Sequence, residues 1–521
     1  METNINRKKE FWIFLALICV LYLGLGVFNT ILLRPQSIHQ WAQCDRASVA
    51  LNYYQESMNL FLPRVHNLDN GTGITGMEFP FVNYSVAVLY KIFGFHEFLY
   101  RLFVLLVYTI GLYCAFLIAR RFLKHFYFSL GVVLLFACSP LLAFYSSNFL
   151  PDPVSLAFSF IAWYFLFRHL DVKETNKYIH LWAIFFCLSA LIKVSALINL
   201  PAMFFCFYYN QNAGQRLKKS VPFVLYALLI VGLVISWYSY AIYLSSKVHS
   251  EMFLLQSRPP QSVKEFLEVW DEVYRVWWER VYENIILFIL LGSLFVYSLF
   301  FKRRDKNLSI ISISLLFSVA GFLYFMWLQL QHHDYYLISL FTTIFFVLIL
   351  SIDLIGKLKL KWNWLIISVL IVSGISYQFA MAKNHIRTSY KIDSWKYGSV
   401  HFNNYFDFES TLEVVGVAKK DKVISIFDHS PEISLYLLNR KGVTVAYRKH
   451  KEVFEKYLLS GHFKYVIYNL ESNFDEFSFS ALEYPLKEIY NNGIIVIYLI
   501  NSNNNFQEKD STTPLLLSPW N

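Results

Sequence analysis

The chain has 521 residues, of which 56% are hydrophobic, 19% aromatic and only 16% charged. A soluble globular domain carries about 25% charged residues, so this composition excludes an ordinary soluble protein and indicates repeated membrane-spanning helices. The formal net charge is +10. It does not indicate nucleic-acid binding, because the basic residues form short clusters between apolar runs, as in the cytoplasmic loops of membrane proteins.

Eleven apolar runs are predicted to be transmembrane helices, which makes most of the chain an all-α polytopic membrane domain. The apolar stretch over 179–209 is divided at Lys193, because a single helix of that length would exceed the roughly 20 residues that cross a bilayer. The predicted spans are Phe11–Leu33, Phe98–Ile118, Tyr127–Tyr145, Val154–Phe167, Ile179–Ile192, Val194–Tyr209, Val221–Tyr243, Ile285–Phe301, Leu308–Leu328, Leu337–Ile355 and Trp364–Met381.

Lysine and arginine clusters lie before the first span and in alternate loops. With eleven spans all of these clusters fall on one side of the membrane, which the positive-inside rule makes cytoplasmic. We therefore predict a cytoplasmic N-terminus and a C-terminus on the opposite side. The clusters occupy positions 7–9, 120–124, 168–177, 216–219, 302–306 and 357–361.

The polar tail predicts a second domain. Residues 1–382 would form the membrane domain, with a long first outside loop over 34–97. Residues 383–500 alternate strand-like and helix-like segments, which predicts an extracytoplasmic α/β domain, and 501–521 is predicted to be disordered. The predicted strands are Lys422–Phe427, Val443–Ala446, Tyr465–Tyr468 and Ile494–Ile500, and the predicted helices are Pro431–Leu438 and His450–Leu459.

Asp45 follows the first span by about a dozen residues and is followed by Arg46. A carboxylate at the membrane surface could act as a general base that takes a proton from an acceptor hydroxyl. The alternative is structural, because aspartate is a preferred helix N-cap, here for a helix over 46–57. Asp152 is a second outside carboxylate, which could orient the acceptor or assist the base, or could be an N-cap with Pro153 at the first helical position.

Two further charged residues lie at predicted span or helix ends. Glu78 precedes Phe79-Pro80 and an amphipathic stretch over 81–93 that could lie in the interface plane. It could contact an acceptor or a metal ion, or be a solvated acid of the first helical turn. Lys193 interrupts an apolar run, where a charge is usually functional. It could bind a lipid phosphate or extend its ammonium group to the interface.

The segment Gln331–Tyr336 places His332, His333, Asp334 and Tyr335 at one span mouth. These side chains could bind phosphate or sugar hydroxyls, and a divalent metal is the alternative ligand. Tyrosines at an interface need no further explanation. Arg258 is a candidate for a phosphate contact, since guanidinium pairs with phosphate through two hydrogen bonds, or it is a surface charge.

The order of these motifs resembles that of the GT-C integral-membrane glycosyltransferases, in particular the aminoarabinose-transferase and protein O-mannosyltransferase-like group. The resemblance covers about the first 350 residues. It rests on an acidic residue after the first span, Glu78-Phe79-Pro80 before a helix ending Tyr90-Lys91-Ile92-Phe93-Gly94, Arg101 opening the second span, Pro151-Asp152-Pro153 opening the fourth, and a lysine before a fresh span.

This resemblance implies inverting transfer of a sugar from a polyprenyl-phosphate donor, with Asp45 as base, Asp152 as the second acidic position and Lys193 near the lipid phosphate. Glu78 matches an acidic position near the acceptor or metal. The family often has Asp-Glu where this chain has Asp45-Arg46, and a basic residue is found in some relatives at the position of Phe79. Phosphate contacts would then shift to Lys193, Arg258 and the two histidines.

The leading functional hypothesis is a glycosyltransferase acting on a glycan, lipid or protein acceptor outside the cytoplasm, in a bacterial inner membrane. It requires carboxylates and cations from separate outside segments to converge on one pocket. A transporter or flippase of lipid-linked sugars is the alternative, but transporters often show paired halves, and the sequence has no such pairing. A polysaccharide polymerase or ligase is a third hypothesis.

Overall fold

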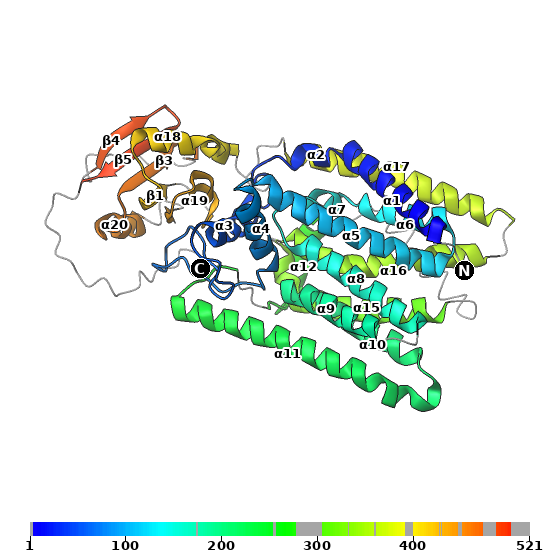
Figure 1. Ribbon diagram of the computed structural model, residues 1–521. Coiled ribbons are helices and arrows are strands. Elements are labelled where there is room, and N and C mark those ends of the chain that lie inside the picture. The colour runs from blue at the N-terminus through cyan, green and yellow to red at the C-terminus, as the bar shows by residue number, and fades with distance from the viewer. Residues whose placement is uncertain are drawn as a thin grey trace. The chain divides into compact units, whose positions relative to one another are not determined.

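The computed structural model of this chain describes residues 4–172, 176–253, 257–277, 305–331, 333–358, 361–390, 400–426, 428, 430–445, 451–472 and 486–501. The chain separates into two compact units (Figure 1). The helical unit comprises Met1–Leu32, Arg101–Tyr238 and Leu255–Thr388, and the mixed unit comprises Leu33–Tyr100, Ser239–Leu254 and Ser389–Asn521.

The helical unit is built from long apolar helices, the form in which a segment can bond its backbone groups internally, as a bilayer requires. Its α-helices are α1 (Asn4–Leu25), α2 (Val27–Thr30), α5 (Phe98–Leu123), α6 (Phe126–Ala137), α7 (Pro140–Tyr145), α8 (Asp152–Asp171), α9 (Lys177–Ile192), α10 (Asn199–Tyr209), α11 (Arg216–Val248), α12 (Val263–Glu272), α15 (Lys306–Met326), α16 (Phe341–Lys357) and α17 (Asn363–Ser389). Short turns of other helix types are η1 (Val194–Ile198), η2 (Ala213–Gln215), η3 (Val273–Trp277), η5 (Trp327–Gln331) and η6 (Asp334–Leu340).

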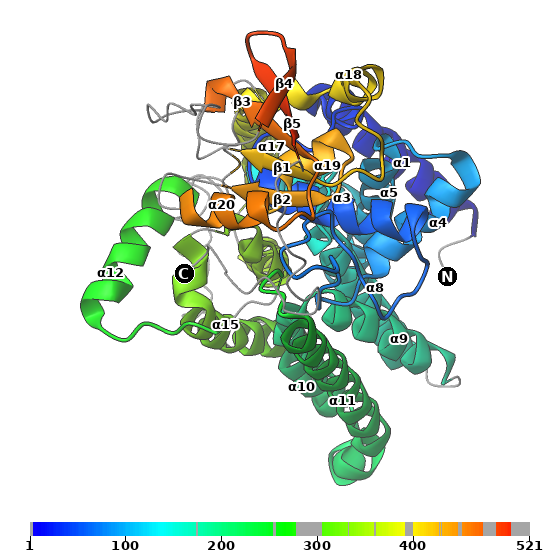
Figure 2. The ribbon, with the colours of Figure 1, turned by 90° about the vertical axis from the view of Figure 1, so that its left-hand side faces the viewer.

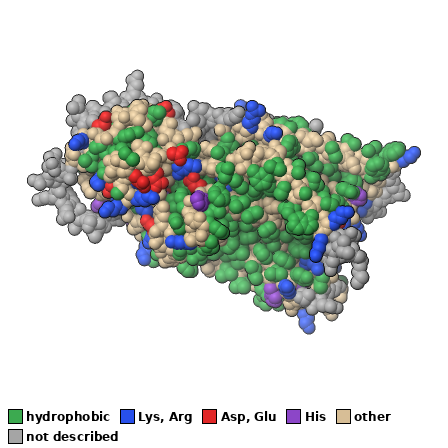
Figure 3. All heavy atoms as spheres, turned by 45° about the horizontal axis from the view of Figure 1, so that its top comes forward, with side chains coloured by type: hydrophobic (Ala, Val, Ile, Leu, Met, Phe, Trp, Pro, Cys, Tyr) green, Lys and Arg blue, Asp and Glu red, His purple; other side chains and the backbone are tan. Residues whose placement is uncertain are grey.

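Six helical segments among the described residues are long and apolar enough to cross a membrane. On the face shown in Figure 3, hydrophobic side chains predominate over a broad part of the surface, as expected for a face that meets lipid. The six segments are Phe98–Leu123, Asp152–Asp171, Ala213–Val248, Lys306–Gln331, Asp334–Lys357 and Asn363–Ser389.

The predicted spans lie on helices, but six of them correspond to the segments above, so the predicted number of eleven spans stays a prediction. Every predicted span within the described residues coincides with a helix or a broken pair of helices, and Ile285–Phe301 lies outside the described residues. The division at Lys193 is confirmed: α9 ends at Ile192, and Lys193 has an extended backbone (φ −141°, ψ 114°) before η1 begins. Two further breaks were not predicted, one at Gly26, which has a left-handed backbone, and one before Pro140.

Helices α8 and α9 are joined by serine hydroxyls rather than by apolar side chains alone. Ser155 Oγ donates to the carbonyl of Ser189 (2.9 Å), and Ser189 Oγ donates to the carbonyl of Ser155 (2.7 Å). Small polar residues of this kind let helix backbones approach closely in a membrane. These contacts fix α8 against the end of α9 that leads into Lys193.

Helices α5 and α8 also approach closely at Gly111. A Cβ atom built on Gly111 would lie 2.5 Å from Ala157 Cα. We expect Gly111→Ala to reduce the free energy of unfolding by about 1–3 kcal/mol, the usual cost of overpacking, measured as a lower thermal midpoint in detergent. The control is Gly232→Ala in α11, because no described atom lies within 4 Å of a Cβ there. A change of about 0.5 kcal/mol or less is expected for it. Equal effects would contradict the packing argument.

The mixed unit contains the first long loop and the C-terminal segment together. Its helices are α3 (Gln40–Gln55), α4 (Phe81–Phe93), η7 (Val400–Tyr405), α18 (Phe408–Val415), α19 (Ile433–Leu438), α20 (Lys451–Leu459) and η9 (Leu470–Ser472). Its strands are β1 (Val423–Ile426), β2 (Gly442–Val445), β3 (Tyr465–Asn469), β4 (Leu486–Asn491) and β5 (Ile495–Ile500). The amphipathic helix predicted over 81–93 is thus confirmed, while the predicted domain boundaries stay predictions.

The five strands form one sheet in the order β2-β1-β3-β5-β4, seen in Figure 2 beside α19 and α20. Strands β1, β2 and β3 are parallel, and β5 pairs antiparallel with both β3 and β4. Every residue of β1 to β3 is buried, as expected for parallel strands covered on both faces. The α/β prediction is confirmed, but β4 was missed because its alternating polar sequence LKEIYN lacks a β-branched run.

The loop between α3 and α4 adds to the edge of this sheet. Asn67 forms a parallel bridge with Gly442, the first residue of β2. The amide of Gly442 donates to the carbonyl of His66 (3.1 Å), and the amide of Leu68 donates to the carbonyl of Gly442 (2.7 Å). An exposed sheet edge is a ready acceptor of such backbone pairing. The first loop and the C-terminal sheet are therefore one hydrogen-bonded structure.

Candidate functional site

Asp45 lies inside helix α3 and does not cap it. The helix begins at Gln40 with His39 as N-cap, so the N-cap interpretation of Asp45 is wrong. Helix α3 is buried on almost all sides, and its glutamines satisfy nearby backbone carbonyls: Gln43 Nε2 donates to Gln36 and Ile38, both at 2.8 Å. These bonds tie the start of α3 to the segment that precedes it, and Asp45 lies on this part of the helix.

The Asp45 carboxylate is 4% exposed, and its Oδ1 has no hydrogen-bond partner among the described residues. Burial raises the pKa of Asp45 to about 7; Arg46 opposes this rise, and the charges of Glu78 and Asp428 add to it. A carboxyl group that changes protonation near neutral pH is suited to general base catalysis. Perturbed pKa values of this kind mark candidate functional residues.

Glu78 is buried and paired with Arg46, so the interpretation as a solvated first-turn acid is wrong. Arg46 Nη2 lies 2.9 Å from Glu78 Oε1, and both side chains are less than a tenth exposed. The guanidinium also lies 4.8 Å from the ring centre of Phe253, and Asn83 Nδ2 donates to the carbonyl of Arg46 (2.7 Å). Arg46 is therefore held between a carboxylate and an aromatic ring, with Asp45 Oδ2 at 3.7 Å.

A second polar cluster follows on the same face of α3. Ser48 and Asn52, at spacings of three and four residues, both reach His66 Nδ1, at 2.7 and 3.2 Å. The Asn52 amide nitrogen also donates to the carbonyl of Ser48, so it faces the ring as a donor, and the ring proton lies on Nε2. Burial lowers the pKa of His66 to about 3, which keeps the ring neutral.

In the helical unit, Asp152 and Lys193 form an ion pair. Asp152 is the first residue of α8 and Pro151 is the N-cap residue, so the N-cap interpretation of Asp152 is wrong. Lys193 Nζ lies 3.3 Å from Asp152 Oδ2, and the two side chains are 13% and 4% exposed. Neither sequence interpretation of Lys193 included this pairing, which accounts for a charge at a helix break in an apolar run.

Aromatic rings surround the Lys193 ammonium. Its Nζ lies 5.6 Å from the ring centre of Tyr335 and 5.7 Å from that of Tyr336. Tyr335 Oη lies 3.0 Å from His333 Nδ1, and Tyr145 Oη donates to Asp334 Oδ1 (2.6 Å). Three of the residues predicted at this span mouth therefore lie in one network with Lys193 and Tyr145, while His332 lies outside the described residues.

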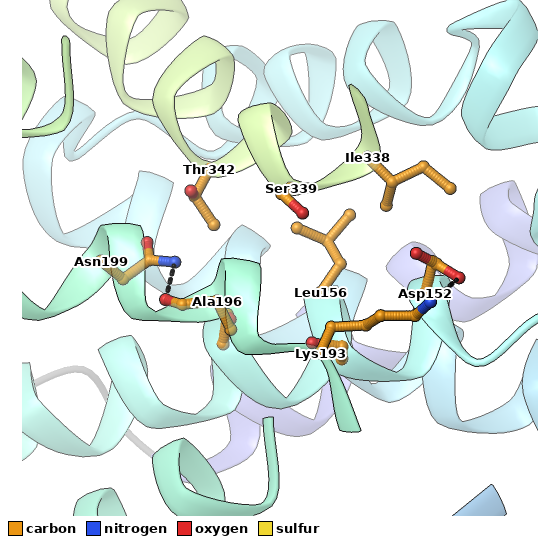
Figure 4. A pocket seen from close by; sticks show the side chains of 10 residues that line it. Asp152, Leu156, Lys193, Ala196, Asn199, Ile338, Ser339 and Thr342 are labelled. Carbon is orange, nitrogen blue, oxygen red and sulfur yellow. Dashed lines mark hydrogen bonds and ion pairs between the residues drawn. The ribbon is translucent and has the colours of Figure 1, made fainter. Parts of the chain in front are cut away.

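A small pocket opens beside this pair. Figure 4 shows Lys193 reaching across it to Asp152, with Ser339, Thr342 and Asn199 on its polar walls. Asn199 is fixed by two hydrogen bonds, to Trp163 Nε1 (3.0 Å) and to the carbonyl of Ala196 (3.0 Å). The pocket combines one cation, one carboxylate and several hydroxyl groups, which is a suitable environment for a phosphate ester.

The metal alternative gains no support from the described residues, because no group of three or more histidine, cysteine or acidic side chains there could hold an ion. Glu78 is held by Arg46 instead. Arg258 is exposed, and its backbone exchanges hydrogen bonds with Phe325 and Leu328 (3.0 and 3.2 Å), so its position is fixed while its side chain stays accessible.

Several residues of these clusters were not predicted from the sequence. Tyr145, which donates to Asp334, and Asn199, which lines the pocket beside Lys193, look like ordinary helix residues in the sequence. His66 and Glu432 lie 366 residues apart in sequence, yet the two side chains are 3.9 Å apart. Asp428 offered a signal, since it directly follows a predicted strand, where functional side chains often gather.

Comparison with solved structures identifies the fold. ArnT from Cupriavidus metallidurans in the apo state matches with a TM-score of 0.58 at 11% identity, over 95% of this chain and 98% of that one. ArnT bound to undecaprenyl phosphate matches with a TM-score of 0.55 at 9% identity, over 94% and 98%. The Archaeoglobus fulgidus oligosaccharyltransferase in the apo form gives 0.53 at 13% identity, over 87% and 69%.

Residues 78–240 match the family model described as dolichyl-phosphate-mannose-protein mannosyltransferase. No curated protein sequence matches the chain. The predicted resemblance to GT-C membrane glycosyltransferases and the predicted fold class are confirmed by the family model and the solved structures together. With its apolar helices, the chain is an integral membrane protein of this fold.

Proposed function

We propose that this chain, which has the GT-C fold and a mannosyltransferase-like segment over 78–240, is an inverting glycosyltransferase. It moves one hexosyl or pentosyl group from a polyprenyl-phosphate donor to a glycan, lipid or protein acceptor. The reaction takes place on the periplasmic side of a bacterial inner membrane, with the N-terminus in the cytoplasm. The fold and the family model indicate the reaction class, and the residues below supply its chemistry.

The observation that carries this proposal is the buried Asp45 carboxylate, whose Oδ1 has no hydrogen-bond partner among the described residues and whose pKa is raised to about 7. In the proposed reaction an Asp45 oxygen takes the proton of the acceptor hydroxyl, and the acceptor oxygen forms a bond to the anomeric carbon. The bond from that carbon to the phosphate oxygen breaks, and its electron pair leaves with the polyprenyl phosphate. One displacement inverts the anomeric carbon, so a single base suffices.

Lys193 is the proposed contact for the leaving phosphate. Its ammonium group, placed between Asp152 and two tyrosine rings, lies at the edge of a pocket with hydroxyl donors. Cationic and hydrogen-bond donors aimed at developing negative charge lower the barrier of such a step. Asp152 holds the lysine in position, and Tyr335 and His333 are further candidate donors. That an ArnT structure holds undecaprenyl phosphate supports this ligand class.

The test is release of the carrier. Purified protein in detergent is incubated with a panel of undecaprenyl-phosphate-linked hexoses and pentoses together with an envelope lipid and glycan extract. Transfer gives free undecaprenyl phosphate and a glycosylated acceptor in equal amounts. Movement of the intact lipid-linked sugar across a vesicle bilayer, without release of carrier, would instead support the transporter hypothesis.

The pH dependence of the reaction follows from Asp45. Because its folded-state pKa is raised to about 7, the carboxyl group is protonated and inactive below that pH and becomes a base above it. We expect kcat/KM to rise through a midpoint at about pH 7 and then to level off. A rate that is flat from pH 5 to pH 8 would contradict the assignment of Asp45 as the base, as would a midpoint near 3.8, the ordinary pKa of an aspartate.

A further inference from the structure

His66 is a buried histidine to which the proposed reaction gives no role. It lies in the loop between α3 and α4, and its side chain is 2% exposed. The backbone of His66 pairs with the edge of the C-terminal sheet, whereas its ring contacts helix α3. Helix α19, which joins β1 to β2, packs against the same helix and lies beside it in Figures 1 and 2. His66 therefore belongs to the interface between the sheet and the helix that carries Asp45.

The backbone around His66 is held by the start of β2 and by the residue before α19. The carbonyl of His66 accepts a hydrogen bond from the amide of Gly442 (3.1 Å), and the carbonyl of Gly442 accepts one from the amide of Leu68 (2.7 Å). Between these two bonds, the amide of Asn67 donates to Glu432 Oε1 (2.8 Å). Because buried backbone groups need such partners, the loop keeps one register against the edge of β2.

The ring of His66 holds two side chains of α3 at once. Its Nδ1 lies 2.7 Å from Ser48 Oγ and 3.2 Å from Asn52 Nδ2, and its backbone amide donates to the same serine oxygen (3.0 Å). Asn52 Nδ2 can only donate, so the ring nitrogen accepts and the ring is neutral in this arrangement. Ser48 and Asn52 are four residues apart and share one face of the helix. A rotation of α3 about its axis would therefore break both contacts together.

Asp45 lies on the same face of α3, three residues before Ser48 and seven before Asn52. Its Oδ1 makes no hydrogen bond within the described residues, and its Oδ2 lies 3.7 Å from Arg46 Nη1, beyond ordinary hydrogen-bond length. The carboxylate therefore takes its position from the helix that carries it. The contact that fixes the rotation of α3 also fixes this carboxylate, and a displacement of about 1 Å in an active site can lower a rate by roughly 100-fold.

We propose that His66 is a positioning residue for Asp45: its neutral ring, held against β2, sets the rotation of α3 by accepting hydrogen bonds from two side chains of that helix. The proposal rests on the proposed function, because Asp45 matters here as the base of sugar transfer. The contact between His66 and α3 can also be tested without substrate. The C-terminal sheet thus acts on the reaction through hydrogen bonds that run from Gly442 through His66 to the helix.

Two substitutions at His66 separate the ring acceptor from the bulk of the side chain. In His66→Asn the side-chain oxygen is as many bonds from Cα as Nδ1 is and can accept the same hydrogen bonds, whereas His66→Leu offers no acceptor. Both keep the backbone pairing with β2. We expect His66→Leu to lower kcat for sugar transfer by about 100-fold. The KM for the lipid-linked donor should not change, because the proposed phosphate contacts lie around Lys193. His66→Asn should restore most of the lost kcat.

Tyr457→Phe is the matched control. Tyr457 Oη on α20 donates to Asp69 Oδ1 (2.6 Å), a contact that ties the same loop to the C-terminal segment without a side chain of α3. Removing this hydroxyl should lower the thermal midpoint in detergent, as His66→Leu does, but leave kcat unchanged. Equal losses of kcat in the two variants, or no loss in His66→Leu, would overturn the proposal, because His66 would then serve stability alone.

The measurement without substrate is amide hydrogen exchange over residues 40–55 of the purified full chain, read by mass spectrometry. Exchange in α3 should become about 10-fold faster in His66→Leu, because two donors of the helix lose their buried acceptor. It should stay at the wild-type rate in His66→Asn and in Tyr457→Phe. Exchange at the wild-type rate in His66→Leu would overturn the proposal.

Two further outcomes remain decisive. If His66→Leu does not fold, Ser48→Ala removes one of the two contacts from the helix side, and faster exchange with a lower kcat is again expected, while no change in either would overturn the proposal. If the wild type transfers no sugar, the proposed function fails. Hydrogen exchange then decides by itself whether His66 holds α3, since faster exchange in His66→Leu alone supports that contact and equal exchange in all variants refutes it.

Discussion

Asp45→Asn is expected to lower the rate of sugar transfer by about 10²- to 10⁴-fold, the usual contribution of a general base. The asparagine is nearly isosteric with the aspartate and cannot accept the proton of the acceptor hydroxyl. The variant should still fold, because Asp45 Oδ1 makes no hydrogen bond within the described residues and burial already favours the neutral acid. The effect is measured as single-turnover release of undecaprenyl phosphate from the lipid-linked sugar that the wild type uses as donor.

The control for this variant is Glu56→Gln, one residue beyond the end of α3. Glu56 is partly exposed and pairs with Arg64 and Lys441, outside the Asp45 surroundings. It should retain wild-type transfer, and both variants should bind undecaprenyl phosphate as the wild type does. Transfer at the wild-type rate by Asp45→Asn would remove Asp45 as the base, whereas loss in both variants would show that the helix itself had been disturbed.

The membrane helices could be predicted from the sequence because the bilayer imposes a single rule on them. Backbone groups in lipid must bond within their own segment, so length and hydropathy alone locate a span. The break at Lys193 was predicted because a single helix over 179–209 would exceed the roughly 20 residues that cross a bilayer. The breaks at Gly26 and Pro140 occur inside apolar runs of acceptable length, and hydropathy does not reveal them.

The roles of single charged residues were harder to predict, because local preference and tertiary packing disagreed. Asp45 and Asp152 were each interpreted as possible N-caps, yet the N-cap residues are His39 and Pro151. Helix α3 starts five residues before Asp45, where glutamine side chains satisfy nearby carbonyls and His39 adopts a left-handed backbone. No local sequence pattern predicts a helix that is buried on nearly all sides. At this segment tertiary packing overrides helix propensity.

The part of the site that no pattern could provide depends on long-range pairing. Asn67 and Gly442 meet because a loop adds to a sheet edge, and Glu432 then lies beside His66, which side chains of helix α3 contact. Sequence analysis identified the strands and the acids separately, but it could not give the register that joins them. The convergence of Asp45 and Asp152 on one pocket stays a prediction.

Lys193→Met is expected to have two separable effects, one on stability and one on ligand binding. The substitution removes the ammonium group that lies 3.3 Å from the buried Asp152 carboxylate. The free energy of unfolding should fall by about 3–5 kcal/mol, the cost of breaking a buried ion pair. The lost charge-assisted contact of about 1.5–3 kcal/mol should weaken undecaprenyl phosphate binding by roughly 10- to 100-fold. Chemical unfolding and native mass spectrometry in detergent measure the two quantities.

The double variant Asp152→Asn with Lys193→Met separates these effects, because replacing both members of a buried pair by neutral groups is often close to neutral for stability. We expect it to recover most of the lost stability while undecaprenyl phosphate binding stays weak. Lys264→Met, which removes an exposed ammonium, should change neither quantity. Were the double variant to recover both stability and binding, Lys193 would be a structural partner of Asp152, and the phosphate contact would have to come from other residues of the pocket.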